Sequence, residues 1–172
     1  MQEQVDSPER KVALACFIGA EQAIAELAKG REQAISGIEY WTAIAETVCC
    51  AVHLVDRTLL ELGPEIRETR MNALIQECIT LMPQGMYEFS PLTRAEVDES
   101  ARTLLLSTYE KRQAEYEALG DDWLNKLLHT YAKHVTELLK LDEPYLALMA
   151  AQKNMVALDS TMLQMVPEFF KQ

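Results

Sequence analysis

The chain has 172 residues, of which 49% are hydrophobic and 25% are charged, which is typical of a folded domain and not of a disordered chain. Its net charge is −11, so it lacks the electrostatic attraction that dominates binding to nucleic acids and to anionic membrane surfaces. We therefore expect one domain over residues 1–172, with no nucleic-acid partner and no membrane partner.

Capping signals and the spacing of apolar residues predict two helices in the first part of the chain. The first begins after Ser7 and ends at Gly30. The second begins after Ser36, which has the spacing of a capping box with Glu39, and it ends at Gly63. Its apolar stripe is the clearest amphipathic pattern in the chain: Trp41, Ile44, Val48, Ala51, Val52, Val55, Leu59 and Leu62.

The third and fourth helices are separated by the longest predicted loop. The third begins at Pro64 and ends before Pro83, because proline lacks the backbone N–H that a helix interior requires. Residues 83–92 then form the loop. Thr93 and Glu96 make a second capping box, which begins the fourth helix, and this helix ends at Gly120.

Two further helices complete the prediction. The fifth begins at Asp121-Asp122 and ends near Asp142, and the sixth begins at Pro144 and ends at Pro167. Long helices joined by such short breaks predict an all-α fold, an antiparallel bundle of about six helices.

The sixth helix has two apolar stripes, whereas a surface helix of a monomer needs only one. The first stripe has heptad spacing: Leu148, Ala151, Met155, Leu158, Met162 and Met165. The second stripe comprises Tyr145, Met149, Val156 and Leu163. The helix is therefore either central in its own bundle or packed on a second chain. For the second case the expected interface comprises Leu148, Met155, Leu158, Met162, Met165, Phe169 and Phe170.

Arg112 lies in the apolar seam of the fourth helix, where an unpaired charge is costly. Asp56, Glu115 and Asp98 are its candidate partners within the chain. A ligand carboxylate or phosphate is the alternative, because an arginine binds such anions through two hydrogen bonds. A ligand pocket between the second, fourth and fifth helices would be lined by Arg112, Tyr109, Tyr116, His53, Asp56 and His134.

Catalytic and metal-binding motifs are absent from the sequence. Cys49, His53 and Asp56 share one side of the second helix, but the chain has no E-x-x-H or H-E-x-x-H pattern, so we expect no metal. It has no nucleophile elbow, Walker loop or dinucleotide-binding glycine pattern either. We therefore expect no cofactor, and an enzyme is the third choice of function.

The sequence favours a cytoplasmic, non-enzymatic interaction protein, such as an adaptor, a chaperone-like protein or an immunity-like protein. The first residues do not resemble a signal peptide, and the four cysteines lack the spacing of a redox or metal motif. The partner is a protein or a second copy of the chain, bound through the C-terminal helix. The alternative function is a ligand-binding helical bundle.

Overall fold

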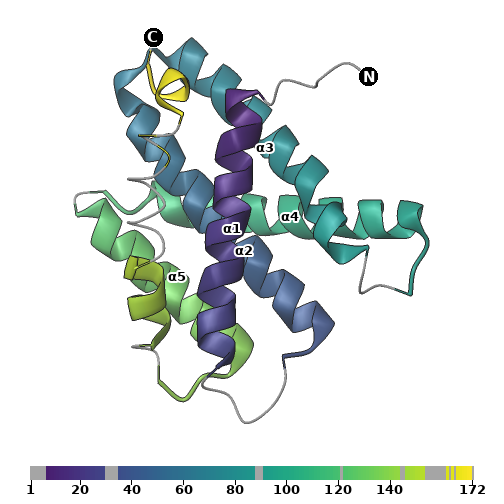
Figure 1. Cartoon of the computed structure of the whole chain (residues 1–172). Coiled ribbons are helices and arrows are strands. Elements are labelled where there is room, and N and C mark those ends of the chain that lie inside the picture. Colours follow the sequence, from purple (N-terminus) through teal and green to yellow (C-terminus); the bar gives the residue numbers. More distant parts are fainter. Residues whose placement is uncertain are drawn as a thin grey trace.

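The computed structural model describes residues 7–29, 35–87, 91–120, 122–143, 146–153, 162, 164 and 166–171. It confirms the all-α fold, because the helices pack against one another around a shared hydrophobic core (Figure 1). The long helices are α1 (Pro8–Ala28), α2 (Gly37–Thr58), α3 (Pro64–Met86), α4 (Arg94–Glu117) and α5 (Trp123–Leu139). Residues 146–153 are also helical, and two short 3₁₀ helices are η1 (Leu59–Glu61) and η2 (Pro167–Phe169).

The predicted capping residues begin three of these helices. The Ser7 hydroxyl accepts a hydrogen bond from the Arg10 amide of α1 at 3.1 Å. Ser36 and Glu39 bond reciprocally at the start of α2, and a second capping box at Thr93 begins α4. Each cap satisfies backbone N–H groups that have no partner inside the helix, which explains why short local signals place these helix starts correctly.

The predicted end of α3 is wrong, because the helix passes through Pro83 and continues to Met86. Pro83 lies in the last turn, so its missing N–H removes a single hydrogen bond near the helix end, and burial of the ring offsets that loss. Gly85 lets the helix approach α2 closely: a Cβ at this position would lie 2.6 Å from Cη2 of Trp41.

α2 is the central helix of the fold. It contacts α1, α3, α4 and α5, and every residue from 43 to 55 is buried. In Figure 1, α1 lies in front of it and α4 crosses behind. The predicted stripe therefore describes only part of the buried surface, because this stretch has apolar side chains on all sides and is covered all round.

Among the described residues, none of the helices combines the length and hydrophobicity that a membrane span requires.

Candidate functional site

Arg112 is the centre of a buried ion cluster between α2, α4 and α5. Its Nε and Nη2 donate to the two carboxylate oxygens of Glu46 at 2.8 and 2.7 Å, and Nη1 donates to Glu115 at 3.1 Å. Glu115 also contacts Nε2 of His134 at 2.9 Å. The side chains of Arg112 and Glu46 are each only 8% exposed. The cluster therefore joins three helices: the Arg112–Glu46 pair between α4 and α2 is largely removed from water, whereas Glu115, which connects to α5, is 39% exposed.

The structure gives Arg112 two anionic partners inside the chain. Glu115 was expected from the sequence, but Glu46, which makes the two-bond contact, was not. The hydrogen bonds that Arg112 donates to Glu46 raise the pKa of Arg112 above its ordinary value, so its charge is maintained. Since the guanidinium is already occupied by two carboxylates, Arg112 provides no argument for a bound ligand anion.

The other two predicted partners of Arg112 lie elsewhere. Asp56 binds Arg67 of α3, with Nε and Nη2 donating at 2.7 and 2.6 Å. Asp98 accepts a hydrogen bond from the hydroxyl of Tyr87 at the end of α3. Both contacts join α3 to a neighbouring helix, so these carboxylates have structural roles of their own.

His53 forms a second polar contact of α2, separate from the ion cluster. Its ring lies 5.2 Å from the ring of Tyr116, and its Nε2 accepts from Nε of Arg57 at 3.4 Å. Burial, and then the Arg57 charge, lower the pKa of His53, so the neutral ring is favoured near neutral pH. Arg57 also donates to the carbonyls of Tyr116 and Glu117 at the end of α4.

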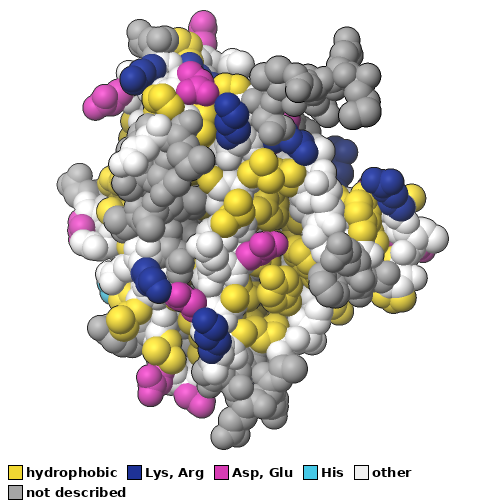
Figure 2. All heavy atoms as spheres, in the orientation of Figure 1, with side chains coloured by type: hydrophobic (Ala, Val, Ile, Leu, Met, Phe, Trp, Pro, Cys, Tyr) yellow, Lys and Arg dark blue, Asp and Glu magenta, His cyan; other side chains and the backbone are white. Residues whose placement is uncertain are grey.

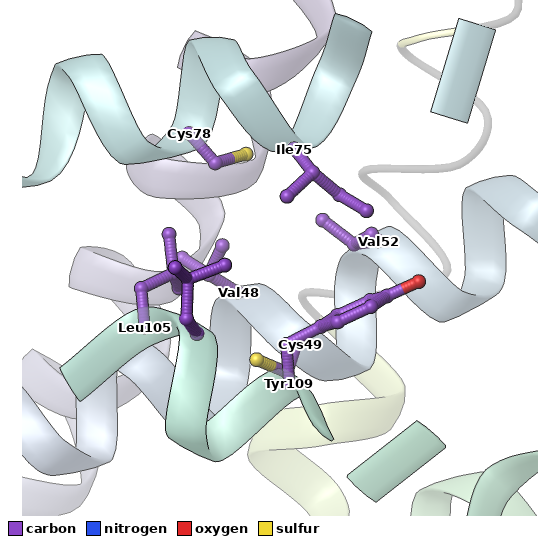
Figure 3. Close-up of a pocket in the computed structure, with 8 residues that line it drawn as sticks. Val48, Cys49, Val52, Ile75, Cys78, Leu105 and Tyr109 are labelled. Atoms are coloured by element: carbon purple, nitrogen blue, oxygen red, sulfur yellow. The ribbon is translucent and has the colours of Figure 1, made fainter. Parts of the chain in front are cut away.

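The two tyrosines of the predicted pocket are in different surroundings. Tyr116 is buried, its pKa is raised by burial, and its hydroxyl has no hydrogen-bond partner among the described residues. Tyr109 lies half-buried beside Cys49 and Cys78 at a small apolar cavity (Figure 3). The cavity measures about 10 Å³, and one water molecule requires roughly 10–15 Å³. It therefore has no room for an organic ligand.

The six predicted pocket residues thus divide into three local groups. Arg112 and His134 share Glu115, His53 contacts Tyr116, and Asp56 with its partner Arg67 influences the pKa of Tyr109. Each group is explained by contacts inside the protein. Of the six residues, Tyr109 lines the small apolar cavity.

The cysteines are packing residues in this fold. All four are buried and unpaired, and burial raises the pKa of Cys16 to about 12. Burial also raises the pKa of Cys49, Cys50 and Cys78. A protonated, covered thiol is a poor nucleophile and a poor metal ligand. Among the described residues, no three His, Cys, Asp or Glu side chains are arranged to hold a metal ion.

A wider surface groove lies between the end of α3 and the start of α4. It has a volume of about 520 Å³ and is open to solvent. The Arg94 guanidinium lies 4.9 Å above the ring of Tyr87 in this groove. The sequence did not indicate this groove, because residues 83–92 were predicted to be a loop, whereas α3 continues to Met86 and forms one side of the groove. Its charged groups are of both signs and exposed, and Arg94 and Asp98 already contact Tyr87, so the groove does not favour a ligand of either charge.

The predicted interface residues are described only in part. Met155, Leu158 and Met165 lie outside the described residues. Leu148 and Phe170 are half-buried, whereas Met162 and Phe169 are each 1% exposed. Phe169 therefore fills a place in the core of the described chain and does not project from the end of it.

No family model, no curated protein and no solved structure matches this chain. Its function must therefore be inferred from the chemistry of its own residues.

Proposed function

We propose that the chain is a non-enzymatic helical interaction protein that self-associates through its C-terminal helix. The observation that supports this is the orientation of the helical residues 146–153. Ala147, Ala150 and Ala151 are buried, whereas Leu146 and Met149 are 45% and 49% exposed. The helix thus turns its alanines and part of Leu148 toward the protein, and it leaves two large apolar side chains, Leu146 and Met149, about half exposed to solvent, which favours a partner on the outer side.

The proposed contact surface also includes apolar side chains of α1. Leu14 and Ile18, one turn apart, are 36% and 53% exposed. Figure 2 shows apolar side chains gathered along and beside α1, divided by an acidic group. Lys153 pairs with Glu26 of α1 at 2.7 Å, so the two helices lie side by side. A second copy could bury side chains from both helices at once.

The buried polar groups support a non-catalytic role. Arg112, Glu46 and Asp56 bind partners within the chain, and the thiols are covered. An enzyme instead needs a reactive group that substrate can reach. A cytoplasmic location also belongs to the proposal, since oxidising compartments favour disulfides and these thiols are unpaired.

Sedimentation of the purified chain over a wide concentration range tests the proposal. We expect a dimer in the wild type and a dimer weakened by at least about tenfold in Ile18→Glu and Met149→Glu, because burying one such side chain contributes about 1.5–3 kcal/mol. Ile38→Glu is the matched control, since Ile38 is 83% exposed in the first turn of α2. A wild type that stays monomeric at every concentration overturns the proposal, and so does a Met149→Glu dimer as stable as the control.

A further inference from the structure

An exposed stripe runs along α1, on the side away from its buried face. With about 100° of rotation per helical residue, five side chains fall within an arc of roughly 80°. They are Lys11, Leu14, Ile18, Glu21 and Ala25, and all five are exposed. α1 lies at the front of the molecule in Figure 1, so this face is accessible to a second molecule. We define these five residues as the α1 stripe.

The α1 stripe has the pattern of a surface that packs on another helix. Its residues alternate in steps of three and four, which is the heptad spacing of paired helices. Leu14 and Ile18, at 36% and 53% exposure, make its centre apolar. A charged residue of opposite sign lies on either side of this centre, Lys11 before it and Glu21 after it. An apolar centre with a charged rim is the usual composition of a protein interface.

Two α1 stripes complement each other when they run antiparallel. A two-fold axis next to position 16 places Leu14 opposite the partner's Ile18, because both lie two positions from the axis. Lys11 and Glu21 both lie five positions from the axis, so Lys11 faces the partner's Glu21. The same contacts recur on the other side of the axis. One helix face thus contains both halves of an isologous interface, which must be self-complementary.

Other arrangements of two stripes are less favourable. A parallel pair would place Lys11 against the partner's Lys11 and Glu21 against the partner's Glu21, and like charges repel. An antiparallel pair shifted by one heptad would place a charged side chain of the stripe against an apolar one. Charge complementarity therefore favours one orientation and one register.

We propose that a second copy of the chain docks on the α1 stripe, with the two α1 helices antiparallel about an axis next to position 16. This inference rests on the proposed self-association and specifies its central contact. The pair between Lys153 and Glu26 places the helical residues 146–153 beside α1. Their exposed apolar side chains therefore extend the surface on which the partner packs.

Charge reversal across the axis tests this arrangement. Lys11→Glu and Glu21→Lys each place like charges opposite each other at both ends of the contact. Each variant should weaken the dimer about tenfold in sedimentation at low salt. Lys11→Glu/Glu21→Lys restores both pairs with their signs exchanged, so its dissociation constant should return to within about threefold of the wild-type value.

Two features of the chain make the rescue specific. Glu168 lies 3.9 Å from Lys11, but it is present in the single and the double variants alike, so it does not explain a rescue. Lys111→Glu is the matched control, because Lys111 is an exposed lysine of α4 and its replacement changes the net charge as much as Lys11→Glu does. This control should dimerise like the wild type.

Carbodiimide coupling of the wild-type chain provides an independent measurement, since the reagent joins an amine to a carboxylate in contact with it. Lys11 and Glu21 are ten residues apart, which is about 15 Å along a helix, so they cannot be coupled within one chain. We therefore expect coupled Lys11–Glu21 peptides in mass spectra of the dimer. Coupling of Lys11 to Glu168, which are paired within the chain, shows that the reagent has reacted.

The outcomes separate this inference from the proposed function. A dimer in which Lys11 does not couple to Glu21, or in which the double variant is as weak as the single ones, overturns the antiparallel α1 pair and leaves self-association standing. A wild-type chain that stays monomeric at every concentration overturns both.

Discussion

Removal of Glu46 is expected to destabilise the fold strongly, although Glu46 is one acidic residue among many. In Glu46→Leu the guanidinium of Arg112 loses two hydrogen bonds and keeps only Glu115, whose side chain is 39% exposed. Arg112 itself is 8% exposed, so water cannot replace the missing carboxylate. Breaking a buried ion pair by removing one partner costs about 3–5 kcal/mol.

Replacing both partners is expected to cost far less. In Glu46→Leu/Arg112→Met no buried charge remains, and apolar side chains of similar volume fill the space between α2 and α4. Such replacements are neutral or stabilise a protein by about 1–4 kcal/mol. The double variant should therefore be more stable than either single variant, and the two effects should not add.

Urea unfolding followed by far-ultraviolet circular dichroism measures these differences. With a slope of about 2 kcal/mol per molar urea, the single variants should lower the midpoint by roughly 1.5–2.5 M. Asp56→Asn is the matched control, because its ion pair with Arg67 is more exposed, at 16% and 34%. A loss below about 1 kcal/mol in Glu46→Leu, or a double variant that loses the sum of both, would refute the reasoning.

Three further predictions follow from burial. The pKa of His53 is lower in the folded protein than in the unfolded chain, so as the pH falls His53 is protonated in the unfolded chain before it is protonated in the folded one. The free energy of unfolding should therefore decrease below about pH 6.5. His53→Phe should flatten this decrease in urea midpoints, whereas a variant of exposed His129 should retain it. Gly85→Ala should displace the Trp41 ring, because the new Cβ would lie 2.6 Å from its far edge, and should change the tryptophan fluorescence. The helix preference of alanine offsets about 1 kcal/mol of the strain, while Gly37→Ala, with open space, should neither change the fluorescence nor lower the urea midpoint. Iodoacetamide should label the four cysteines only after unfolding, and rapid labelling of the native protein, detected by mass spectrometry, would contradict their burial.

The helix starts could be predicted from the sequence because capping is local. Ser36 and Glu39, or Thr93 and Glu96, interact within about one turn, so four consecutive residues contain the whole interaction. The end of α3 could not be predicted in the same way. Whether Pro83 stops a helix depends on what its ring packs against, and that partner lies on another part of the chain.

The partner of Arg112 was also hard to predict, because it lies far away in the sequence. The sequence indicated that this buried charge needs an anion, and it suggested Asp56, Asp98 and Glu115, of which only Glu115, three residues away on the same helix, contacts it. Glu46 lies sixty-six positions earlier in the chain, but a signal for it was present. Residues 43–55 are apolar except for Glu46, Thr47 and His53, so this helix had to be covered on all sides and its polar groups had to find partners.

By itself the sequence determined that the chain forms long helices, where most of them begin, and that some charges require partners, because these properties depend on neighbours within one or two turns. Only the tertiary structure decided which helix is central, which carboxylate holds Arg112, and that Phe169 is covered. Those outcomes depend on helices that are distant in the sequence meeting in space, and the periodicity of one helix does not specify its neighbours.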